Sequence, residues 1–120
     1  MKILIADDSR VMRQIVVRTL RQAGFGEHSL IEASNGREAL DLAKAEKPDL
    51  ILSDWNMPEM NGMELLRQLR AAGNEVKFGF VTSESTPEMK DQAAHAGALF
   101  FIVKPFSPER FDEVFSPILG

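Results

Sequence analysis

Five short apolar runs alternate along the chain with longer segments in which apolar residues recur every three or four positions. The runs cover residues 3–6, 29–33, 50–53, 77–82 and 99–103, and their lengths are typical of β-strands. The first, third and fifth runs are apolar at nearly every position, which predicts parallel strands buried on both faces. Gly79 interrupts the fourth run, and a glycine inside a strand indicates a close approach by a neighbouring group.

The segments between the runs have the period of amphipathic helices. In the first segment Met12, Val16 and Leu20 are spaced by four, and we expect Ile15 and Ala23 to lie on the same side. Two further stripes are formed by Ala39, Leu42 and Ala43, and by Leu65, Leu66 and Leu69. One face of each helix is therefore predicted to pack on the sheet.

Helix starts are marked by residues that cap free backbone amides. The spacing of a capping box, in which two side chains bind backbone amides reciprocally, occurs at Asn35 with Glu38 and at Asn61 with Glu64. Thr86 and Ser107 each place a capping hydroxyl before a proline, which favours the first helical position. These signals set the predicted starts of four helices.

Helix ends are marked by glycine and proline. Gly24, Gly73 and Gly97 fit helix exits, where a left-handed backbone is common. Pro117 lies in the last helical segment, and it predicts that this helix either stops near Ser116 or kinks there.

Five strands alternating with five helices predict an α/β fold, a doubly wound parallel sheet covered by helices on both faces. A chain of 120 residues is predicted to form one domain over residues 1–120. In such sheets ligands bind beyond the carboxyl ends of the strands, where the strand order reverses. Residues that directly follow the strands are therefore the candidates for function.

Acidic residues follow two of the apolar runs. Asp7 and Asp8 close the first run, and Asp54 closes the third. If the two strands are neighbours, three carboxylates meet at one edge of the sheet and repel one another. A divalent cation offsets this repulsion, and Mg²⁺ binds carboxylate oxygens while keeping room for waters and phosphate oxygens. The sequence therefore predicts a Mg²⁺ site.

Lys104 follows the fifth run and Thr82 is the last residue of the fourth, so both are expected at the same edge. The Lys104 ammonium is suited to pair with a carboxylate or a phosphoryl oxygen, and the peptide bond to Pro105 is a candidate for the cis form. The Thr82 hydroxyl can donate to a phosphoryl oxygen on Asp54. Because carboxylates form acyl phosphates, these residues suit phosphoryl transfer to Asp54.

Composition excludes several other classes. The net charge is −4 and no run of Lys and Arg forms a basic stripe, which argues against a nucleic-acid surface. Without cysteine there is neither a disulfide nor a thiolate metal site. The first apolar run is too short to span a membrane or to act as a signal peptide. We therefore expect a cytoplasmic protein that binds no membrane.

The order and spacing of these residues resemble the receiver domains of two-component response regulators over essentially the whole chain. Four segments carry the resemblance: Asp7-Asp8; Asp54-Trp55-Asn56-Met57-Pro58 with Asn61-Gly62; Val81-Thr82-Ser83-Glu84; and Val103-Lys104-Pro105-Phe106. Within this family the chain is most similar to the single-domain, CheY-like chemotaxis type.

The resemblance implies a flavodoxin-like strand order of 2-1-3-4-5 and a role for each residue. Asp54 is expected to be the phosphoacceptor, and Thr82 and Lys104 to bind the phosphoryl group. Asp8, the Asp54 side chain and the Asn56 main-chain carbonyl are expected to hold Mg²⁺, or Mn²⁺ in its place. Asp7 is expected to assist through water.

The resemblance also implies partners. A sensor histidine kinase or a histidine phosphotransfer domain is expected to donate the phosphoryl group. Phosphorylation is expected to change the face formed by the fourth helix, fifth strand and fifth helix, and a downstream protein is expected to bind that face. The domain is expected to be a monomer and to dephosphorylate itself slowly. Asn56 and Glu84 are expected to tune that hydrolysis. The domain is thus a signalling phosphoacceptor rather than an enzyme with a separate substrate.

One position departs from the family pattern. The residue three before the lysine is often a tyrosine that turns inward on activation, whereas this chain has Phe101 there and contains no tyrosine. A phenylalanine ring can still rotate, but it brings no hydroxyl to a partner.

Three other kinds of protein share parts of this pattern. A metal-dependent phosphatase needs a second acid two residues after its first-strand nucleophile, and Ser9 stands there instead. A flavin-binding module needs a phosphate loop that the Asp7-Asp8 pair would repel. A receiver cut from a larger regulator or hybrid kinase is the third, although Met1 leading directly into the first strand favours a natural start.

Overall fold

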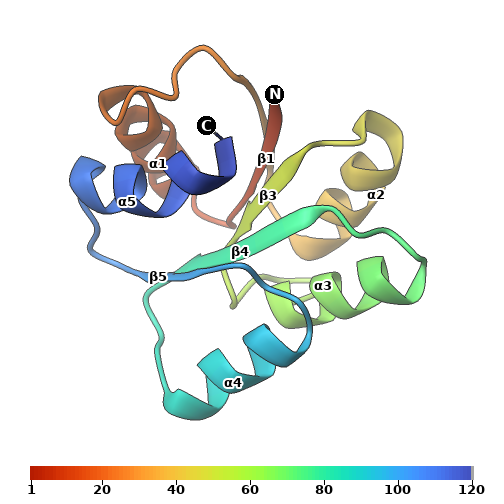
Figure 1. Cartoon of the computed structure of the whole chain (residues 1–120). Helices are drawn as coiled ribbons and strands as arrows, with labels where there is room; N and C mark the ends of the chain where they lie inside the picture. Colours follow the sequence, from red (N-terminus) through yellow and green to blue (C-terminus); the bar gives the residue numbers. More distant parts are fainter. Residues whose placement is uncertain (120) are drawn as a thin grey trace.

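A computed structural model describes residues 1–119 and contains one sheet between two layers of helices (Figure 1). The strands are β1 (Lys2–Ala6), β2 (Ser29–Ala33), β3 (Leu50–Ser53), β4 (Lys77–Thr82) and β5 (Phe101–Val103). The helices are α1 (Arg10–Gln22), α2 (Gly36–Glu46), α3 (Gly62–Ala71), α4 (Pro87–His95) and α5 (Pro108–Leu119). The predicted alternation of strands and helices is confirmed.

All strand pairs are parallel, and the strand order is β2-β1-β3-β4-β5, as the family resemblance implied. The chain runs from β1 to β2 on one side and then crosses to β3 on the other, so the order reverses beside β1. In the β1–β3 register Ala6 lies opposite Ser53. The residues that follow, Asp7 and Asp54, therefore leave the sheet side by side.

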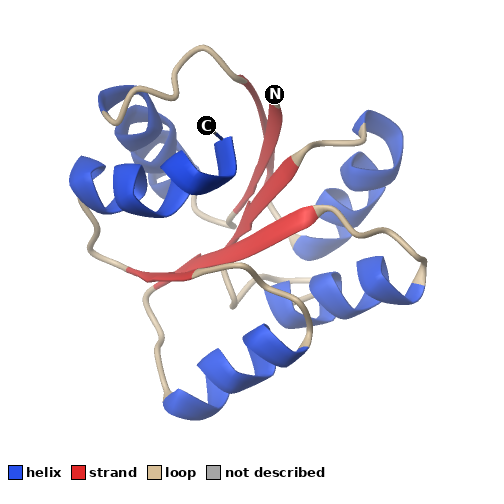
Figure 2. Cartoon of the chain, viewed as in Figure 1, coloured by secondary structure: helices blue, strands red, loops and turns tan. Residues whose placement is uncertain are grey.

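The two faces of the sheet bury separate cores. α1 and α5 cover one face, and α2, α3 and α4 cover the other (Figure 2). Successive residues of β1 alternate between them: Ile3 and Ile5 belong to the first core, and Leu4 and Ala6 to the second. Because both faces are covered, β1 and β3 are apolar at every position except Lys2 and Ser53, in agreement with the prediction.

β5 contradicts the prediction of a strand buried on both faces. It begins only at Phe101, Leu99 is 54% exposed and Val103 is 37% exposed. β5 is exposed in part because it is an edge strand and the helices do not cover all of it, although its residues are apolar. The chain before it still pairs with β4, since the Leu99 amide donates to the Phe78 carbonyl at 2.8 Å.

Gly79 is explained by an aromatic ring. A Cβ atom at this position would lie 2.2 Å from ring carbons of Phe100. That ring in turn packs edge-on against Phe115 of α5, with 5.1 Å between the ring centroids. The close approach predicted from the sequence is confirmed, and its purpose is to seat Phe100 between β4 and α5.

The predicted caps form, but neither capping box closes as predicted, and in the described residues no hydrogen bond joins the Glu64 carboxylate to the Asn61 amide. The side chains of Asn35, Asn61 and Thr86 each accept a hydrogen bond from a first-turn amide. At α2 the Glu38 carboxylate accepts from the Ser34 amide at 2.8 Å, whereas a capping box predicts a bond from the Asn35 amide. The exits after α1, α3 and α4 have the expected left-handed glycines at positions 24, 73 and 97.

α1 presents a different face to the core than the spacing suggested. Val16, Thr19 and Leu20 are buried, whereas Ile15 is 36% exposed, so its expected burial is wrong. Thr19 can take its place because its hydroxyl donates to the Ile15 carbonyl at 2.7 Å, which satisfies the buried polar group.

α5 packs through Phe111 and Phe115, which are fully buried, while Val114 is only partly buried. The helix continues past Pro117 to Leu119, so the alternative of a stop near Ser116 is wrong. Proline is tolerated there because it removes a single backbone donor close to the helix end.

Candidate functional site

Three carboxylates meet at the carboxyl edge of the sheet. Oxygens of Asp7, Asp8 and Asp54 all lie within 4.8 Å of one another. Asp7 is 4% exposed, Asp8 is exposed, and Asp54 lies between these extremes. The adjacency of β1 and β3 brings the acids together, as expected from the sheet order.

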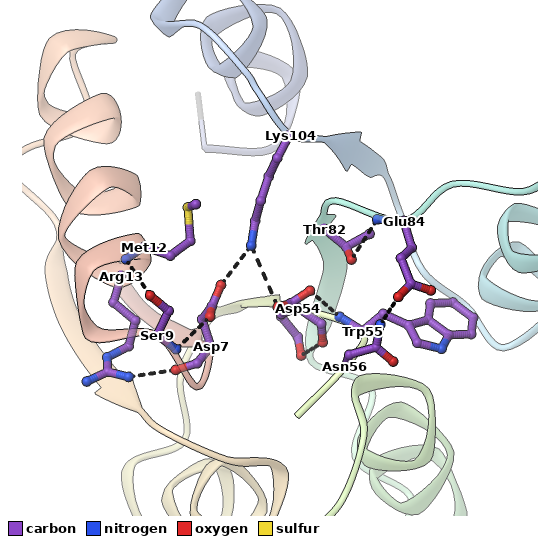
Figure 3. A network of polar contacts seen from close by, with 11 residues as sticks. Asp7, Ser9, Met12, Arg13, Asp54, Trp55, Asn56, Thr82, Glu84 and Lys104 are labelled. Atoms are coloured by element: carbon purple, nitrogen blue, oxygen red, sulfur yellow. Dashed lines mark hydrogen bonds and ion pairs between the residues drawn. The ribbon is translucent and has the colours of Figure 1, made fainter. Parts of the chain in front are cut away.

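Asp7 is fixed through its backbone and both carboxylate oxygens. Its amide donates to the Ala33 carbonyl at 3.1 Å, which extends the pairing of β1 with β2 by one residue. Its Oδ1 accepts from the Ser9 amide at 2.9 Å, and its Oδ2 accepts from Lys104 Nζ at 2.9 Å. These contacts join the start of α1 to the end of β5 (Figure 3).

Lys104 is the first residue after β5, and its side chain extends over the acids. Its Nζ also lies 3.6 Å from Asp54 Oδ2, and its side chain is only 12% exposed. The Lys104–Pro105 peptide bond is cis. The sequence analysis placed this ammonium at the acidic edge, and the structure shows it between two of the three carboxylates (Figure 3).

Asp54 has a pKa above its ordinary value, chiefly because burial disfavours its charged form. The nearby Asp7 carboxylate acts in the same direction. Three groups oppose the rise in pKa: the Thr82 side chain, the Lys104 ammonium and the Trp55 amide. The Trp55 amide donates to Asp54 Oδ1 at 2.8 Å. Thr82 is fully buried at the end of β4, and its hydroxyl accepts from the Glu84 amide at 3.4 Å.

The donor set suits a hard divalent cation. It consists of oxygen ligands only, and one ammonium among three carboxylates leaves an excess of negative charge. The exposed Asp8 leaves one side of the cluster open to solvent. Asp7, Asp8 and Asp54 therefore fit the ion that receiver domains generally use, Mg²⁺.

Asn56 and Glu84 contact each other across the mouth of the site. The Asn56 side-chain amide donates to Glu84 Oε1, which joins the loop after β3 to the loop after β4 (Figure 3). Sequence reasoning assigned both residues to the same task but did not foresee this contact. The use of the Asn56 main-chain carbonyl as a metal ligand stays a prediction.

Sequence reasoning missed Arg13. Its guanidinium donates from Nη1 to the Asp7 carbonyl at 2.6 Å and from Nε to Glu32 Oε1 at 3.0 Å. A signal was present: Arg13 lies three and seven residues before Val16 and Leu20, so it shares the helix face that is buried. A charged residue on a buried face requires partners, and here they belong to the site.

Phe101 lies beside the site in an aromatic group. Its ring centroid is 6.3 Å from that of Trp55 and 5.8 Å from that of Phe80. The side chain is partly buried. It therefore packs against the residue that follows Asp54, as well as serving as the candidate switch position.

A groove runs along the outer side of β5 between α4 and α5. It carries two basic side chains and several apolar ones. It is lined by Lys90, Phe101, Val103, Pro105, Phe106, Ser107 and Arg110.

None of the helices in the described part of the chain has the length and apolar character needed to span a bilayer.

Comparison with known proteins agrees with this geometry. The sequence model of the response regulator receiver domain matches residues 3–116. The chain is 40% identical over 123 aligned positions to a chemotaxis protein CheY homolog of Campylobacter jejuni, an alignment that covers all of this chain and 93% of that protein. It is 37% identical to chemotaxis protein CheY1 of Helicobacter pylori, of which 98% is covered.

The structure of the Vibrio cholerae chemotaxis protein CheY4 is similar with a TM-score of 0.84 and 36% identity. The similarity covers 98% of this chain and 97% of that one. Structure, sequence and the arrangement of acids around Lys104 thus agree, and they favour the receiver over the phosphatase interpretation. The chain belongs to the response regulator receiver domain family.

Proposed function

We propose that Asp54 accepts a phosphoryl group from a phosphohistidine of a sensor kinase or phosphotransfer domain. One observation carries this proposal: Lys104 Nζ lies 2.9 Å from Asp7 and 3.6 Å from Asp54, inside a cluster of three carboxylates. An ammonium held there is placed to bind a phosphoryl oxygen when one arrives on Asp54. The single sheet supports one receiver domain over the chain.

Magnesium would be held by Asp8, the Asp54 side chain and the Asn56 main-chain carbonyl, with Asp7 assisting through water. When bound, Mg²⁺ or its substitute Mn²⁺ offsets the charge of the carboxylates and of the incoming phosphoryl oxygens. Asp7 is held in place before the reaction by the Ser9 amide and the Ala33 carbonyl, and Lys104 is held by its contact with Asp7. Such positioning is the main contribution that a protein makes to phosphoryl transfer.

In the transfer step a carboxylate oxygen of Asp54 attacks phosphorus, the phosphorus–nitrogen bond to the donor histidine breaks, and the imidazole leaves. Thr82 donates its hydroxyl hydrogen bond to the phosphoryl group, and Lys104 pairs with a second oxygen. Hydrolysis reverses the modification: water attacks phosphorus, inorganic phosphate leaves, and the Asp54 carboxylate is restored. Asn56 and Glu84, whose side chains contact each other, are expected to control the entry of that water.

The response is a shift between two conformations. Movement of Thr82 and Lys104 toward the phosphoryl group pulls on the chain beyond β4 and β5, which borders the groove between α4 and α5. The basic residues Lys90 and Arg110 suit an acidic segment of a downstream protein. The named relatives support a chemotaxis pathway for this output.

The test combines the protein with Mg²⁺ and acetyl phosphate. We expect an added phosphoryl mass and a change in the fluorescence of Trp55, the only tryptophan and the neighbour of Asp54. Asp54→Asn should show neither, because it lacks the nucleophilic carboxylate. Asp41→Asn, which removes an exposed acid on α2, is the matched control and should behave as the wild type.

The proposal is wrong if the wild type gains no phosphoryl mass under these conditions. It is also wrong if Asp54→Asn gains that mass as the wild type does, because another residue would then be the acceptor.

A further inference from the structure

We propose that Arg13 is a positioning residue that holds the Asp7–Asp8 peptide and thereby sets the affinity of the site for its divalent cation. This inference rests on the proposed function, in which Asp8 is a metal ligand. It concerns a residue of α1 that contributes no ligand atom itself. Figure 3 shows Arg13 on the far side of Asp7 from Lys104.

The Asp7 carbonyl lies just beyond the end of β1, where the ladder to β2 stops. The Asp7 amide still reaches the Ala33 carbonyl, but the Asp7 carbonyl accepts from Arg13 Nη1 at 2.6 Å. Asp7 is 4% exposed, and a carbonyl at such a place needs a donor from the protein. The arginine is therefore built into the end of the strand.

Asp8 depends on this bond more than Asp7 does. The Asp7 carboxylate is fixed by Ser9 and Lys104 through its own oxygens. The Asp8 side chain is exposed, and its direction follows from the orientation of the peptide that joins it to Asp7. Since Arg13 binds the carbonyl of that peptide, it fixes the direction in which the Asp8 carboxylate leaves the backbone.

Glu32 on β2 completes the arrangement. Its carboxylate accepts from Arg13 Nε at 3.0 Å, and the Arg13 side chain is only 13% exposed. The planar guanidinium donates in two directions at once, which a lysine ammonium on a flexible stem does not reproduce. Removing Arg13 takes one positive charge from beside the acids, which by itself would strengthen cation binding. Weaker binding in an Arg13 variant would therefore report the lost geometry.

The experiment measures the Mg²⁺ dissociation constant by titrating Trp55 fluorescence in the wild type, Arg13→Met, Arg13→Lys and Arg18→Met. Arg18 is an exposed arginine of the same helix, so its variant controls for the loss of one positive charge. Thermal unfolding without metal is followed in parallel. Phosphorylation by acetyl phosphate is then measured over a range of Mg²⁺ concentrations.

We expect Arg13→Met to weaken Mg²⁺ binding by about tenfold, as is common when a residue that orients a ligand is lost. Arg13→Lys should recover only part of the affinity, and Arg18→Met should match the wild type. Saturating Mg²⁺ should restore the phosphorylation rate of Arg13→Met to near that of the wild type. A residue that only stabilises the fold would lower the unfolding temperature and leave the dissociation constant unchanged.

The inference is overturned if Arg13→Met or Arg13→Lys, while folded, binds Mg²⁺ as tightly as the wild type. It is also overturned if Arg18→Met weakens binding equally, because the effect would then not depend on the bond to the Asp7 carbonyl. If the wild type binds Mg²⁺ and accepts the phosphoryl group, and Arg13→Met binds Mg²⁺ with equal affinity, only this inference is refuted. A wild type that does neither would refute the proposed function itself.

Discussion

At the scale of single residues, Asp54 carries opposing demands. Its carboxylate must be charged to attack phosphorus, yet burial raises its pKa and the nearby Asp7 adds to that rise. Thr82, Lys104 and the Trp55 amide lower the pKa again, so the nucleophile is kept reactive by its neighbours. Two of these groups, Thr82 and Lys104, are also proposed to bind the phosphoryl oxygens, which links the resting state to the reaction.

This raised pKa predicts a pH dependence of stability without metal. Between the ordinary value of 3.8 and the raised pKa, folded Asp54 keeps a proton that the unfolded chain has released. The contribution of Asp54 to the free energy of unfolding is therefore present at low pH and is lost as pH rises through the raised pKa. Asp54→Asn should unfold at a higher temperature than the wild type at pH 7, and the difference should shrink toward pH 4.

Thermal unfolding in the presence of a chelator checks this prediction. Asp41→Asn is again the control, and it should show no such pH-dependent gain. A lower unfolding temperature for Asp54→Asn at pH 7 would mean that the hydrogen bonds and the lysine outweigh burial.

Lys104 competes with the proposed cation for the same carboxylates. We expect Lys104→Gln to bind Mg²⁺ more tightly than the wild type, on the order of tenfold, because one positive charge near the site is gone. The same variant should phosphorylate slowly, since the phosphoryl group loses its ammonium partner. Fluorescence titration of Trp55 measures the affinity, with Lys90→Gln, an exposed lysine on α4, as the control. Weaker Mg²⁺ binding by Lys104→Gln would contradict the competition.

At the scale of elements, Gly79 of β4 lets the Phe100 ring lie directly against the strand. Gly79→Ala places a methyl group 2.2 Å from the Phe100 ring, which is held by Phe115. We expect the variant to lose about 1–3 kcal/mol of unfolding free energy, as overpacked cores do. Urea denaturation measures the loss.

The double variant Gly79→Ala with Phe100→Leu separates this clash from a general weakness of alanine at the site. A smaller side chain at 100 should remove most of the added cost, so the effects of the two changes should not sum. Additive losses would show that the ring is not what requires glycine at 79.

Elements were predicted unequally well, and the reasons are physical. Caps and exits at Asn35, Asn61 and Thr86 follow from local hydrogen bonding, which the sequence contains directly. The start of β5 at Phe101 and the exposure of Ile15 depend on which neighbours cover them, and composition does not report that. Edges of sheets and helix faces are settled by tertiary contacts.

At the scale of the whole molecule, the site joins parts that are far apart in sequence. Lys104 and Asp7, 97 positions apart, meet at 2.9 Å. The ends of β4 and β5 thus connect the acids to the groove between α4 and α5. We therefore propose that a change in charge at Asp54 is coupled to this groove, where a partner is expected to dock.

Beryllofluoride, together with Mg²⁺, mimics the acyl phosphate. Hydrogen exchange measured with and without it tests this coupling. We expect exchange to change in α4, β5 and the start of α5, and to stay the same in β1 and β3, which are buried on both faces. Asp54→Asn should show no response to the mimic. A response confined to the loop around Asp54 would mean that the groove is not coupled to the site.

By itself the sequence determined the fold class, the helix caps, the acids at the strand ends and the family to which they belong. Those features depend on local chemistry and on residue order, so one chain suffices to read them. Tertiary structure alone decided that Arg13 supports the Asp7 carbonyl, that Asn56 meets Glu84, and that Phe100 requires a glycine at 79. These contacts join segments whose relative placement is fixed only when both faces of the sheet are packed.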